Sequence, residues 1–527
     1  MTKKYVDSVR RLLSRRSALQ GFGAIAGTAV IGCGGDDSPG SSGTETTGDG
    51  STETGGETSS SSSSTGDGDG DGDTTTGDGD GDSTTGDGDG DGDGDGDGEL
   101  ACDDDLGMAP EALLANIDHI VVLCMENRSW DHYFGSRKLV EGEASNGLSG
   151  DETNPNMGGI DIPIYPLPDD AAPADPPHQW DEVHAQWANG AIDQFVIENE
   201  KINPDQAGEV MGYHVRSALP MLYTLADEFC LLDNYFCSLL AGTWPNRYYL
   251  HAATSGGQQS NFPATGVTSI QDVCDDNGIS HNNYYDGIVS WQTGAFPITS
   301  FTRTDGIDEF FSRVESGQLE EVVIIDPDFL SNDDHPSNGN GPALGQVLIS
   351  TVYQALAQSE HWDRTLLLIT YDEHGGFFDH VMPPAAVDDE PGFGQMGFRV
   401  PAVVAGGQIR RGCVISELLE HSSWPATVTR KYGLAEMTSR AAATKDLSVC
   451  VNPNYIDDPQ PPAPLPKIDV SWKEALAHVG QQTSQHELME YAGIEVPLQG
   501  RHLRDAQAAC KRLLKRAEKL GVINLKP

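Results

Sequence analysis

The chain has 527 residues and a formal net charge of −49 at pH 7, from 81 acidic and 32 basic residues. This excess of negative charge argues against nucleic acid as a partner and against binding to anionic membranes through a basic face. It does not exclude zwitterionic lipid head groups. About two dozen of the acidic residues lie within residues 34–105, where there is no Lys or Arg, and the rest of the chain is also acidic.

Residues 1–33 have the layout of an export signal, with basic residues, a short apolar core and a processing site. Arg15 and Arg16, followed by a weakly hydrophobic Gly-rich stretch, resemble a twin-arginine signal, a route that carries folded proteins. Residues 29–33 (AVIGC) resemble a lipoprotein processing box, with Cys33 as the lipidated residue. We therefore predict an exported protein that is lipid-anchored to the cell envelope through Cys33, at the outer membrane or cell surface.

Residues 34–105 consist almost entirely of Gly, Ser, Thr, Asp and Glu. Such a segment cannot bury enough apolar surface to fold, so we predict a disordered linker. An alternative is that the Asp-Gly run near residues 86–98 binds calcium, because spaced carboxylates resemble parts of calcium loops. The run lacks the bidentate Glu and the hydrophobic positions of those loops, which favours the linker.

The predicted catalytic domain, residues 106–470, opens with a buried strand. Residues 117–125 (IDHIVVLCM) form a nearly continuous apolar run, which is typical of a parallel strand covered on both faces. Glu126 and Asn127 follow at the place where α/β sheets position ligand chemistry. The alternative is an ordinary strand-to-helix turn in which Asn127 is the helix N-cap.

Three further residues are candidates for catalysis. Gly242 allows a tight turn and Pro245 suits the first turn of a helix, so Thr243 is expected near a helix N-terminus. A hydroxyl at such an anion-binding end, beside a metal, is suited to accept a phosphoryl group. The alternative is that Thr243 only caps the helix. His178 and His335 lie in Pro-rich and polar loops, where histidines without further context are more often surface residues.

A second apolar run ends in carboxylates. Residues 364–376 (RTLLLITYDEHGG) predict a buried strand with Asp372 and Glu373 at its carboxyl end, followed by glycines that allow a sharp turn. Adjacent carboxylates repel one another unless a cation lies near them, and oxygen-rich clusters suit a hard divalent metal. The alternative, a solvated acidic loop, explains poorly why the pair ends so hydrophobic a run.

These stretches, in this order, resemble the bacterial phosphoesterase family that contains the non-specific phospholipases C and a related group of acid phosphatases. The family is similar in fold to alkaline phosphatases and sulfatases, so the resemblance implies an α/β fold with one mostly parallel sheet sandwiched between helices. The chain departs from many phospholipase-type members at Gly242, where they carry Pro. The resemblance covers roughly residues 115–435 and includes residues 176–180 (PPHQW), 193–195 (DQF), 334–336 (DHP), 377–381 (FFDHV) and 398–401 (FRVP).

The resemblance also implies a site for one divalent metal ion, in which Thr243 is both a ligand and the nucleophile. His178 and His335 would contact the phosphoryl oxygens or protonate the leaving group. A ligand set made only of oxygen atoms favours magnesium, calcium or manganese over zinc or copper. The remaining ligands of this implied site are Glu126, Asn127, Asp372 and Glu373.

We therefore predict an exported, metal-dependent phosphoesterase that acts on phospholipid head groups as a phospholipase C. An alternative is an acid phosphatase acting on soluble phosphomonoesters. A function of another class, a surface-displayed binding protein on an inactive scaffold, is suggested only by the linker and the anchor. The expected partners are the phosphate-ester substrate and, through the lipid anchor, a membrane.

Residues 471–527 contain two amphipathic segments and are predicted to form a helical tail packed on the catalytic domain. Cys124 lies inside the first strand and is expected to be a buried thiol. The pairing of the other cysteines after Cys33 cannot be read from the sequence, although an oxidising compartment would favour disulfides. These cysteines are Cys102, Cys230, Cys237, Cys274, Cys413, Cys450 and Cys510.

Overall fold

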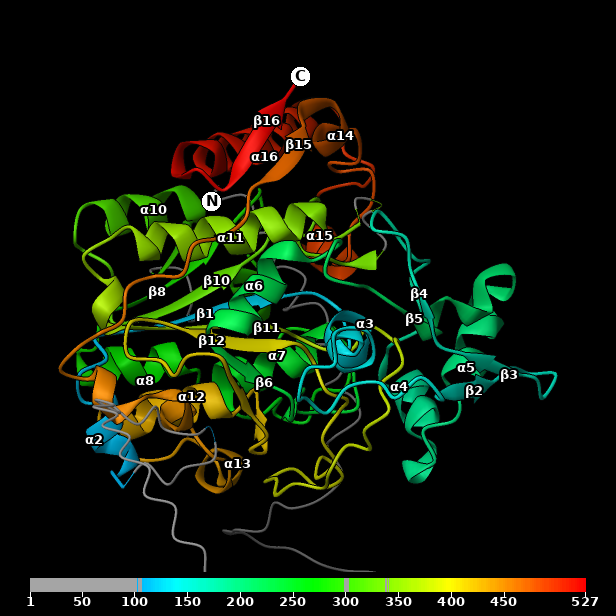
Figure 1. The fold of residues 1–527 in the computed structure, drawn as a ribbon, viewed down its shortest axis with the longest axis horizontal. Coiled ribbons are helices and arrows are strands. Elements are labelled where there is room, and N and C mark those ends of the chain that lie inside the picture. The colour runs from blue at the N-terminus through cyan, green and yellow to red at the C-terminus, as the bar shows by residue number, and fades with distance from the viewer. Residues whose placement is uncertain (1–101, 103–106, 298–302, 337–338, 340) are drawn as a thin grey trace, which may run out of the picture. The chain divides into compact units, whose positions relative to one another are not determined.

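An eight-stranded sheet forms the centre of the part of the chain that the computed structural model describes, which comprises residues 102, 107–297, 303–336, 339 and 341–527 (Figure 1). The predicted signal, Cys33 and the linker up to residue 105 fall outside these residues, apart from Cys102. In spatial order the strands are β13 (Cys413–Ile415), β6 (Cys230–Leu232), β12 (Ala402–Ala405), β11 (Thr365–Tyr371), β1 (His119–Met125), β10 (Val322–Asp326), β8 (His281–Tyr285) and β9 (Thr304–Gly306).

The sheet is mostly parallel, because β12 alone among these eight strands runs against its neighbours. β1 pairs in parallel with β10 on one side and with β11 on the other. Every residue of β1 after His119 is buried, and so is all of β11. Burial of both faces explains why the two sequence segments are continuous apolar runs and do not alternate with polar residues. The predicted α/β fold with a mostly parallel sheet is confirmed.

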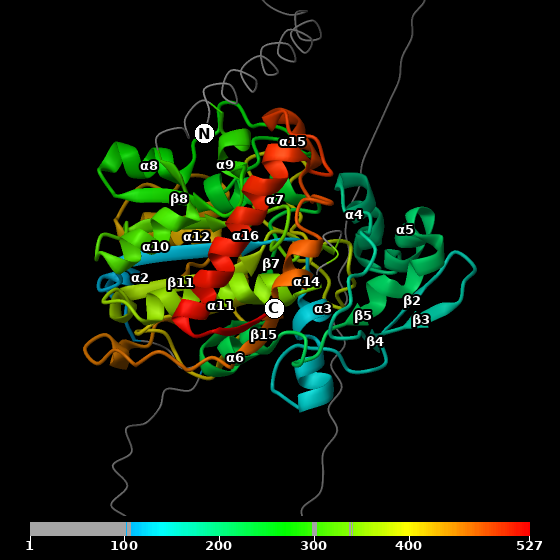
Figure 2. The ribbon, with the colours of Figure 1, turned by 90° about the horizontal axis from the view of Figure 1, so that it is seen from above.

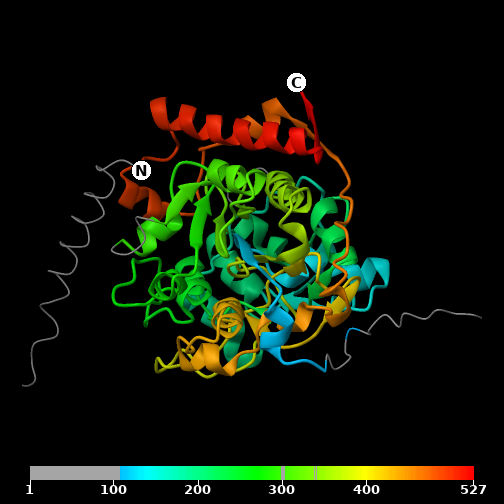
Figure 3. The same ribbon diagram turned by 90° about the vertical axis from the view of Figure 1, so that its left-hand side faces the viewer.

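Helices cover both faces of the sheet (Figures 1 and 3). On one face α11 (Ala343–Ala357) packs against β11 and lies between α6 (Pro220–Glu228) and α10 (Ile307–Glu315). The other face carries α7, α8, α12, α2 and α13, which contact one another in pairs. Their bounds are Thr243–Ala252, Ile270–Asn277, Ser423–Lys431, Pro110–Leu114 and Ser439–Ala443.

A small lobe stands beside α3 (Trp130–Phe134), at the end of the sheet where β1 finishes (Figure 1). It has its own apolar core, which includes Phe195 and Met211 and continues into Phe378 and Phe398 of the main domain. The lobe is therefore packed against the loops that follow β11. Its elements are β2 (Thr153–Pro155), β3 (Asp161–Pro163), β4 (Tyr165–Pro166), α4 (Trp180–Trp187), α5 (Phe195–Ile202) and β5 (Gly212–Tyr213).

The C-terminal part packs on the outer side of α11 through the long helix α16 (Gly500–Leu520) (Figure 2). Its short helices are α14 (Trp472–Ala477) and α15 (His486–Ala492). β15 (Ile468–Ser471) and β16 (Ile523–Lys526) pair in parallel, so the segment predicted as a helical tail also contains a strand. Within the described residues, no helix has both the length and the apolar character needed to cross a bilayer.

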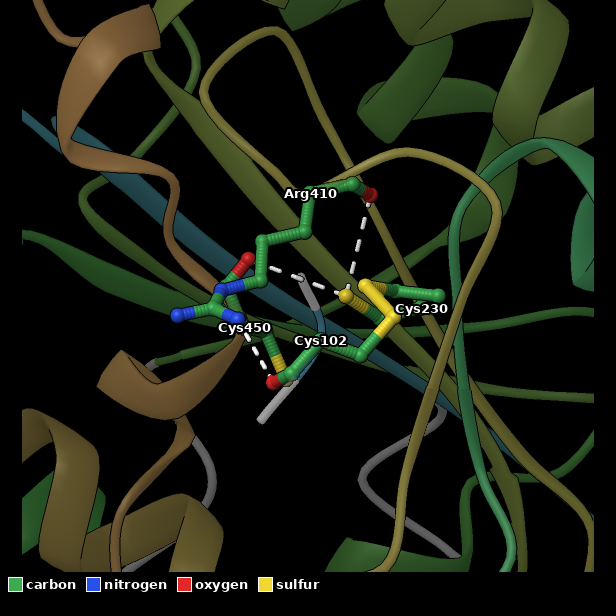
Figure 4. The surroundings of a disulfide bond; sticks show 5 residues. Cys102, Cys230, Arg410 and Cys450 are labelled. Carbon is green, nitrogen blue, oxygen red and sulfur yellow. Dashed lines mark hydrogen bonds between the residues drawn. A yellow bond between two sulfur atoms is a disulfide. The ribbon is translucent and has the colours of Figure 1, made fainter. Parts of the chain in front are cut away.

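One disulfide, between Cys102 and Cys413, joins positions 311 residues apart and fixes the start of the described chain to the edge strand β13 (Figure 4). The Cys230 thiol lies beside it and contacts the backbone carbonyls of Arg410 and Cys450, each at 3.7 Å. Pairing over so long a separation depends on the tertiary fold, which is why the sequence left it open. The free and buried cysteines of the described residues are Cys124, Cys230, Cys237, Cys274, Cys450 and Cys510.

Candidate active site

Two pairs of polar residues meet at the carboxyl ends of β1 and β11. The parallel register sets the last residues of the two strands opposite each other. Glu126 and Asn127 follow β1, and Asp372 and Glu373 follow β11, so the pairs become neighbours. The backbone N–H of Asn127 donates to Asp372 Oδ1 at 3.0 Å, and its side-chain amide donates to Glu373 Oε1. All four side chains are fully buried.

The backbone around Asn127 is shaped by this close approach. Asn127 has φ +58°, a left-handed conformation that is uncommon outside glycine and that Asn tolerates better than most residues. Gly375 also has a positive φ, and a Cβ atom there would lie 2.3 Å from the Asn127 carbonyl oxygen. Only glycine fits at this position. The N-cap of α3 is Ser129, which accepts from the His132 N–H, so Asn127 is not the helix cap.

Thr243 is the first residue of α7, and its side chain is only 2% exposed. The N-cap position belongs to Gly242, and the helix has no side-chain capping hydrogen bond, so the Thr243 hydroxyl does not cap α7. A Cβ atom on Gly242 would lie 3.2 Å from the His178 carbonyl oxygen. The turn that carries Thr243 is therefore packed directly against the loop that carries His178.

A buried arginine, which the sequence did not predict, links the two strand ends. Arg247 follows Thr243 by one helical turn, and its guanidinium lies 2.9 Å from Glu126 Oε1 and 3.4 Å from Asp372 Oδ2. It also pairs with Asp326, at the end of β10, at 2.8 Å. The only sequence signal was a cation in a helix that proves to be buried throughout. Arg247 offsets part of the negative charge that these carboxylates place in the interior.

His178 and His335 lie together at the edge of the strand-end residues, with ring centroids 5.7 Å apart. His178 Nε2 is 3.3 Å from the Asn127 amide nitrogen and 3.8 Å from Glu373 Oε1. Asp175 Oδ1 is 3.7 Å from a ring nitrogen of each histidine. Asp175, His178 and His335 each offer a ligand atom within 4.8 Å of the others, so they are also a candidate group for holding a cation.

The two histidines have pKa values shifted in opposite directions. Burial lowers the pKa of His178, but the Glu373 and Asp175 carboxylates outweigh burial and raise the pKa to about 9. Burial, with the charge of His178 added, lowers the pKa of His335 to about 4, although Asp175 opposes this. At neutral pH His178 is thus protonated and His335 is neutral. Two histidines whose pKa values differ in this way can supply one proton donor and one neutral hydrogen-bonding group.

Two further histidines contact the strand-end carboxylates. His374 Nδ1 is 3.3 Å from Glu373 Oε2, and its other nitrogen bonds the Gln186 side chain. His421 Nε2 donates to the backbone carbonyl of Asp372 at 2.6 Å, and burial lowers the pKa of His421 to about 4. His421 thus contacts the backbone of Asp372, a predicted metal ligand.

His380 belongs to a different cluster, although it follows the same loop. Its Nδ1 lies 2.7 Å from Asp131 Oδ2, and Arg399 pairs with both Asp131 and Asp379. This network ties the motifs that carry Asp131, Asp379 and Arg399 to one another. His380 therefore contacts Asp131 and lies in a network separate from the strand-end carboxylates.

The strand-end residues suit a divalent cation. Asn127 Oδ1 and Asp372 Oδ2 are buried and accept no hydrogen bond from the described residues, although Arg247 stands near the latter. Burial raises the pKa of Glu126 and of Asp372, as expected where carboxylates exceed the available cations. Carboxylate, amide and hydroxyl oxygens are the donors that hard divalent ions prefer. The described residues are thus compatible with a divalent metal.

The chain is similar to known phospholipases C and matches one family model. The chain is 33% identical to non-specific phospholipase C1 of Arabidopsis thaliana over 372 residues, which cover 62% of this chain and 68% of the relative. It is 31% identical to phospholipase C A of Mycobacterium tuberculosis over 392 residues, which cover 61% and 74%. A distant resemblance, with 13% identity and a TM-score of 0.35 over 63% of this chain and 70% of the other, links it to an alkaline phosphatase superfamily protein of Vibrio parahaemolyticus. The Phosphoesterase family model matches residues 117–435, more than half of the chain, and the protein therefore belongs to the Phosphoesterase family, as an enzyme that hydrolyses phosphate esters.

Proposed function

We propose that this enzyme is a metal-dependent phospholipase C-like hydrolase in which Thr243 is the nucleophile. The observation that carries the proposal is the meeting of four oxygen-donor residues at the parallel ends of β1 and β11, with two buried oxygens that accept no hydrogen bond from the residues that the structure describes. In this proposal Thr243, the first residue of α7, supplies the fifth oxygen. The other four residues are Glu126, Asn127, Asp372 and Glu373.

When bound, a divalent ion would offset the phosphoryl charge and lower the pKa of the threonine hydroxyl. Thr243 Oγ1 attacks phosphorus while its proton passes to solvent, and the bond from phosphorus to the leaving oxygen breaks. His178, protonated at neutral pH, gives its proton to that oxygen. A water molecule then attacks the phosphothreonine and the bond from phosphorus to Oγ1 breaks. One proton of the water restores the Thr243 hydroxyl, the other reprotonates His178, and the phosphate product leaves. His335 stays neutral and hydrogen-bonds the phosphoryl group.

Phospholipid head groups are the proposed substrate class, because the relatives compared above are named phospholipases C. In that reaction diacylglycerol leaves and the phosphorylated head group passes to Thr243. Soluble phosphomonoesters are the second candidate. The acidic chain favours zwitterionic over anionic lipid surfaces.

Side-by-side assays separate these substrates. The metal-loaded protein is given phosphatidylcholine vesicles and para-nitrophenyl phosphate at equal phosphate concentration, and diacylglycerol and nitrophenol are measured. We expect the larger kcat/KM for phosphatidylcholine. Turnover of the nitrophenyl ester alone would reject the phospholipase assignment and retain the phosphomonoesterase.

The pH dependence of the reaction should reflect His178. Its raised pKa keeps the proton donor present at neutral pH and removes it as pH rises through about 9. A bound cation would lower this pKa, so we expect kcat/KM for para-nitrophenyl phosphate to fall at or below that pH. His178→Gln should lower the neutral-pH rate by about 10²–10⁴-fold and abolish this basic limb. If kcat/KM of the variant still falls at the same basic pH, a group other than His178 is responsible for the fall.

We also propose that the enzyme is exported and held to the cell envelope by a lipid on Cys33, as the sequence predicts. The Cys33→Ala variant should be recovered in the soluble fraction with its specific activity unchanged, because Cys33 lies far in sequence from every proposed site residue. Fractionation in high salt with activity assays checks this. Retention of the variant in the membrane fraction would show that something other than this lipid holds the protein there.

A further inference from the structure

Gln485 lies beyond the residues that match the family model, yet its side chain reaches the active site. It directly precedes α15 and is completely buried. Its Nε2 donates to Glu126 Oε2 at 2.8 Å, and its Oε1 accepts from Trp244 Nε1 at 2.7 Å. One amide group therefore contacts both a proposed metal ligand and the residue that follows Thr243.

These contacts do not arise from helix capping. Gln485 occupies the N-cap position of α15, but its side chain makes no capping hydrogen bond. The amide instead donates to a carboxylate and accepts from an indole N–H, a combination that no apolar side chain can provide. A leucine of similar size would leave Glu126 without this donor and the Trp244 N–H without this acceptor.

The segment that carries Gln485 is itself fixed to the site. Thr483 Oγ1 donates to a backbone carbonyl after β10 at 3.0 Å and accepts from the Gln485 N–H at 3.1 Å. Ser484 Oγ donates to Asp333 Oδ2 at 2.8 Å. The Asp333 carbonyl oxygen in turn accepts from the Glu126 N–H at 2.8 Å. The backbone of Glu126 is thus held by Asp333, which Ser484 contacts. The side chain of Glu126 is held by Gln485 itself.

The two carboxylate oxygens of Glu126 have different partners. Arg247 pairs with Oε1, while Gln485 donates to Oε2, so the carboxylate is held from both sides. Because Gln485 also bonds Trp244, the same side chain sets the position of the Thr243 end of α7 relative to Glu126. Hydrogen bonds of this kind orient metal ligands, and their loss commonly weakens metal binding.

We infer that Gln485 is a positioning residue that holds Glu126 and the N-terminus of α7 in one arrangement. The active site then has both of these contacts only when residues 483–485 are packed against it. This inference rests on the function proposed above, in which Glu126 is a metal ligand and Thr243 is the nucleophile. Gln485 itself acts through these two residues and does not touch the reacting atoms.

The test compares Gln485→Leu with a matched variant on the same segment, Glu490→Gln, whose side chain is exposed on α15. Manganese is titrated into chelator-stripped, full-length protein and bound metal is measured directly. We expect Gln485→Leu to bind manganese about 10–100-fold more weakly. With para-nitrophenyl phosphate at saturating metal, kcat should fall at least tenfold with KM changed less than threefold. Glu490→Gln should match the wild type in both measurements.

A second variant, Gln485→Glu, covers the case in which the leucine variant does not fold. It keeps an acceptor for Trp244 but replaces the donor toward Glu126 with a like charge, so it should show the same loss. Wild-type manganese affinity and kcat in either folded variant would overturn the inference. A wild-type protein that binds no manganese would count against the proposed metal, and the kcat comparison would still decide the role of Gln485.

Discussion

Replacing Thr243 with alanine is expected to lower turnover by about 10³-fold or more, because the variant lacks the proposed attacking oxygen. The fold should survive. Thr243 does not cap α7, whose N-cap is Gly242, so the substitution removes a small buried side chain and no capping hydrogen bond. A loss of about 0.5–3 kcal/mol of unfolding free energy is expected. In a domain of this size that corresponds to a melting temperature lower by a few degrees.

The Thr243→Ser variant is the matched control. It keeps the hydroxyl and loses only the methyl group, so it should retain a measurable fraction of the wild-type rate. Acid quenching during turnover, followed by mass spectrometry, should find phosphate on residue 243 in the wild type and in the serine variant. An alanine variant with a tenth of wild-type turnover, and with normal metal content, would rule out Thr243 as the nucleophile.

The second large effect is expected at Asp372. Asp372→Asn removes the charge of a proposed metal ligand but keeps an oxygen that can accept from the Asn127 and Glu373 backbone N–H groups, as Asp372 Oδ1 does. Bound metal and activity should therefore fall together, each by about tenfold or more. Glu126→Gln should behave in the same way. The control is Asp389→Asn, because Asp389 is exposed and its carboxylate accepts from the Ser439 N–H.

Asp372→Asn should not lower the thermal stability of the metal-free protein, although it weakens metal binding. Burial raises the pKa of Asp372, so the folded protein favours the protonated carboxyl group, and ionisation of this group lowers stability as pH rises from its unfolded-state pKa through its folded-state pKa. At neutral pH the neutral amide removes this cost, and metal-free Asp372→Asn should melt no lower than the metal-free wild type. Metal should raise the melting temperature of the wild type by more than that of the variant. Full wild-type activity after exhaustive chelation would contradict a metal role for this site.

The sequence alone determined the framework of the site. Two continuous apolar runs predicted buried parallel strands, and Glu126, Asn127, Asp372 and Glu373 follow them directly. This worked because burial on both faces leaves a local signature in the chain, and because parallel strands end at the same edge of a sheet. The turn before Thr243 could be read for the same reason, since glycine and proline constrain the backbone locally.

Only the tertiary structure decided what surrounds those residues. Arg247, Gln485 and His421 reach the strand ends from three separate segments, and nothing in their local sequence indicates that they are buried there. The opposite pKa shifts of His178 and His335 likewise depend on which carboxylates lie nearby and on burial. Local periodicity records which face of an element is covered. It does not record which distant side chain lies opposite, because that is set by how the helices and the C-terminal segment pack on the sheet.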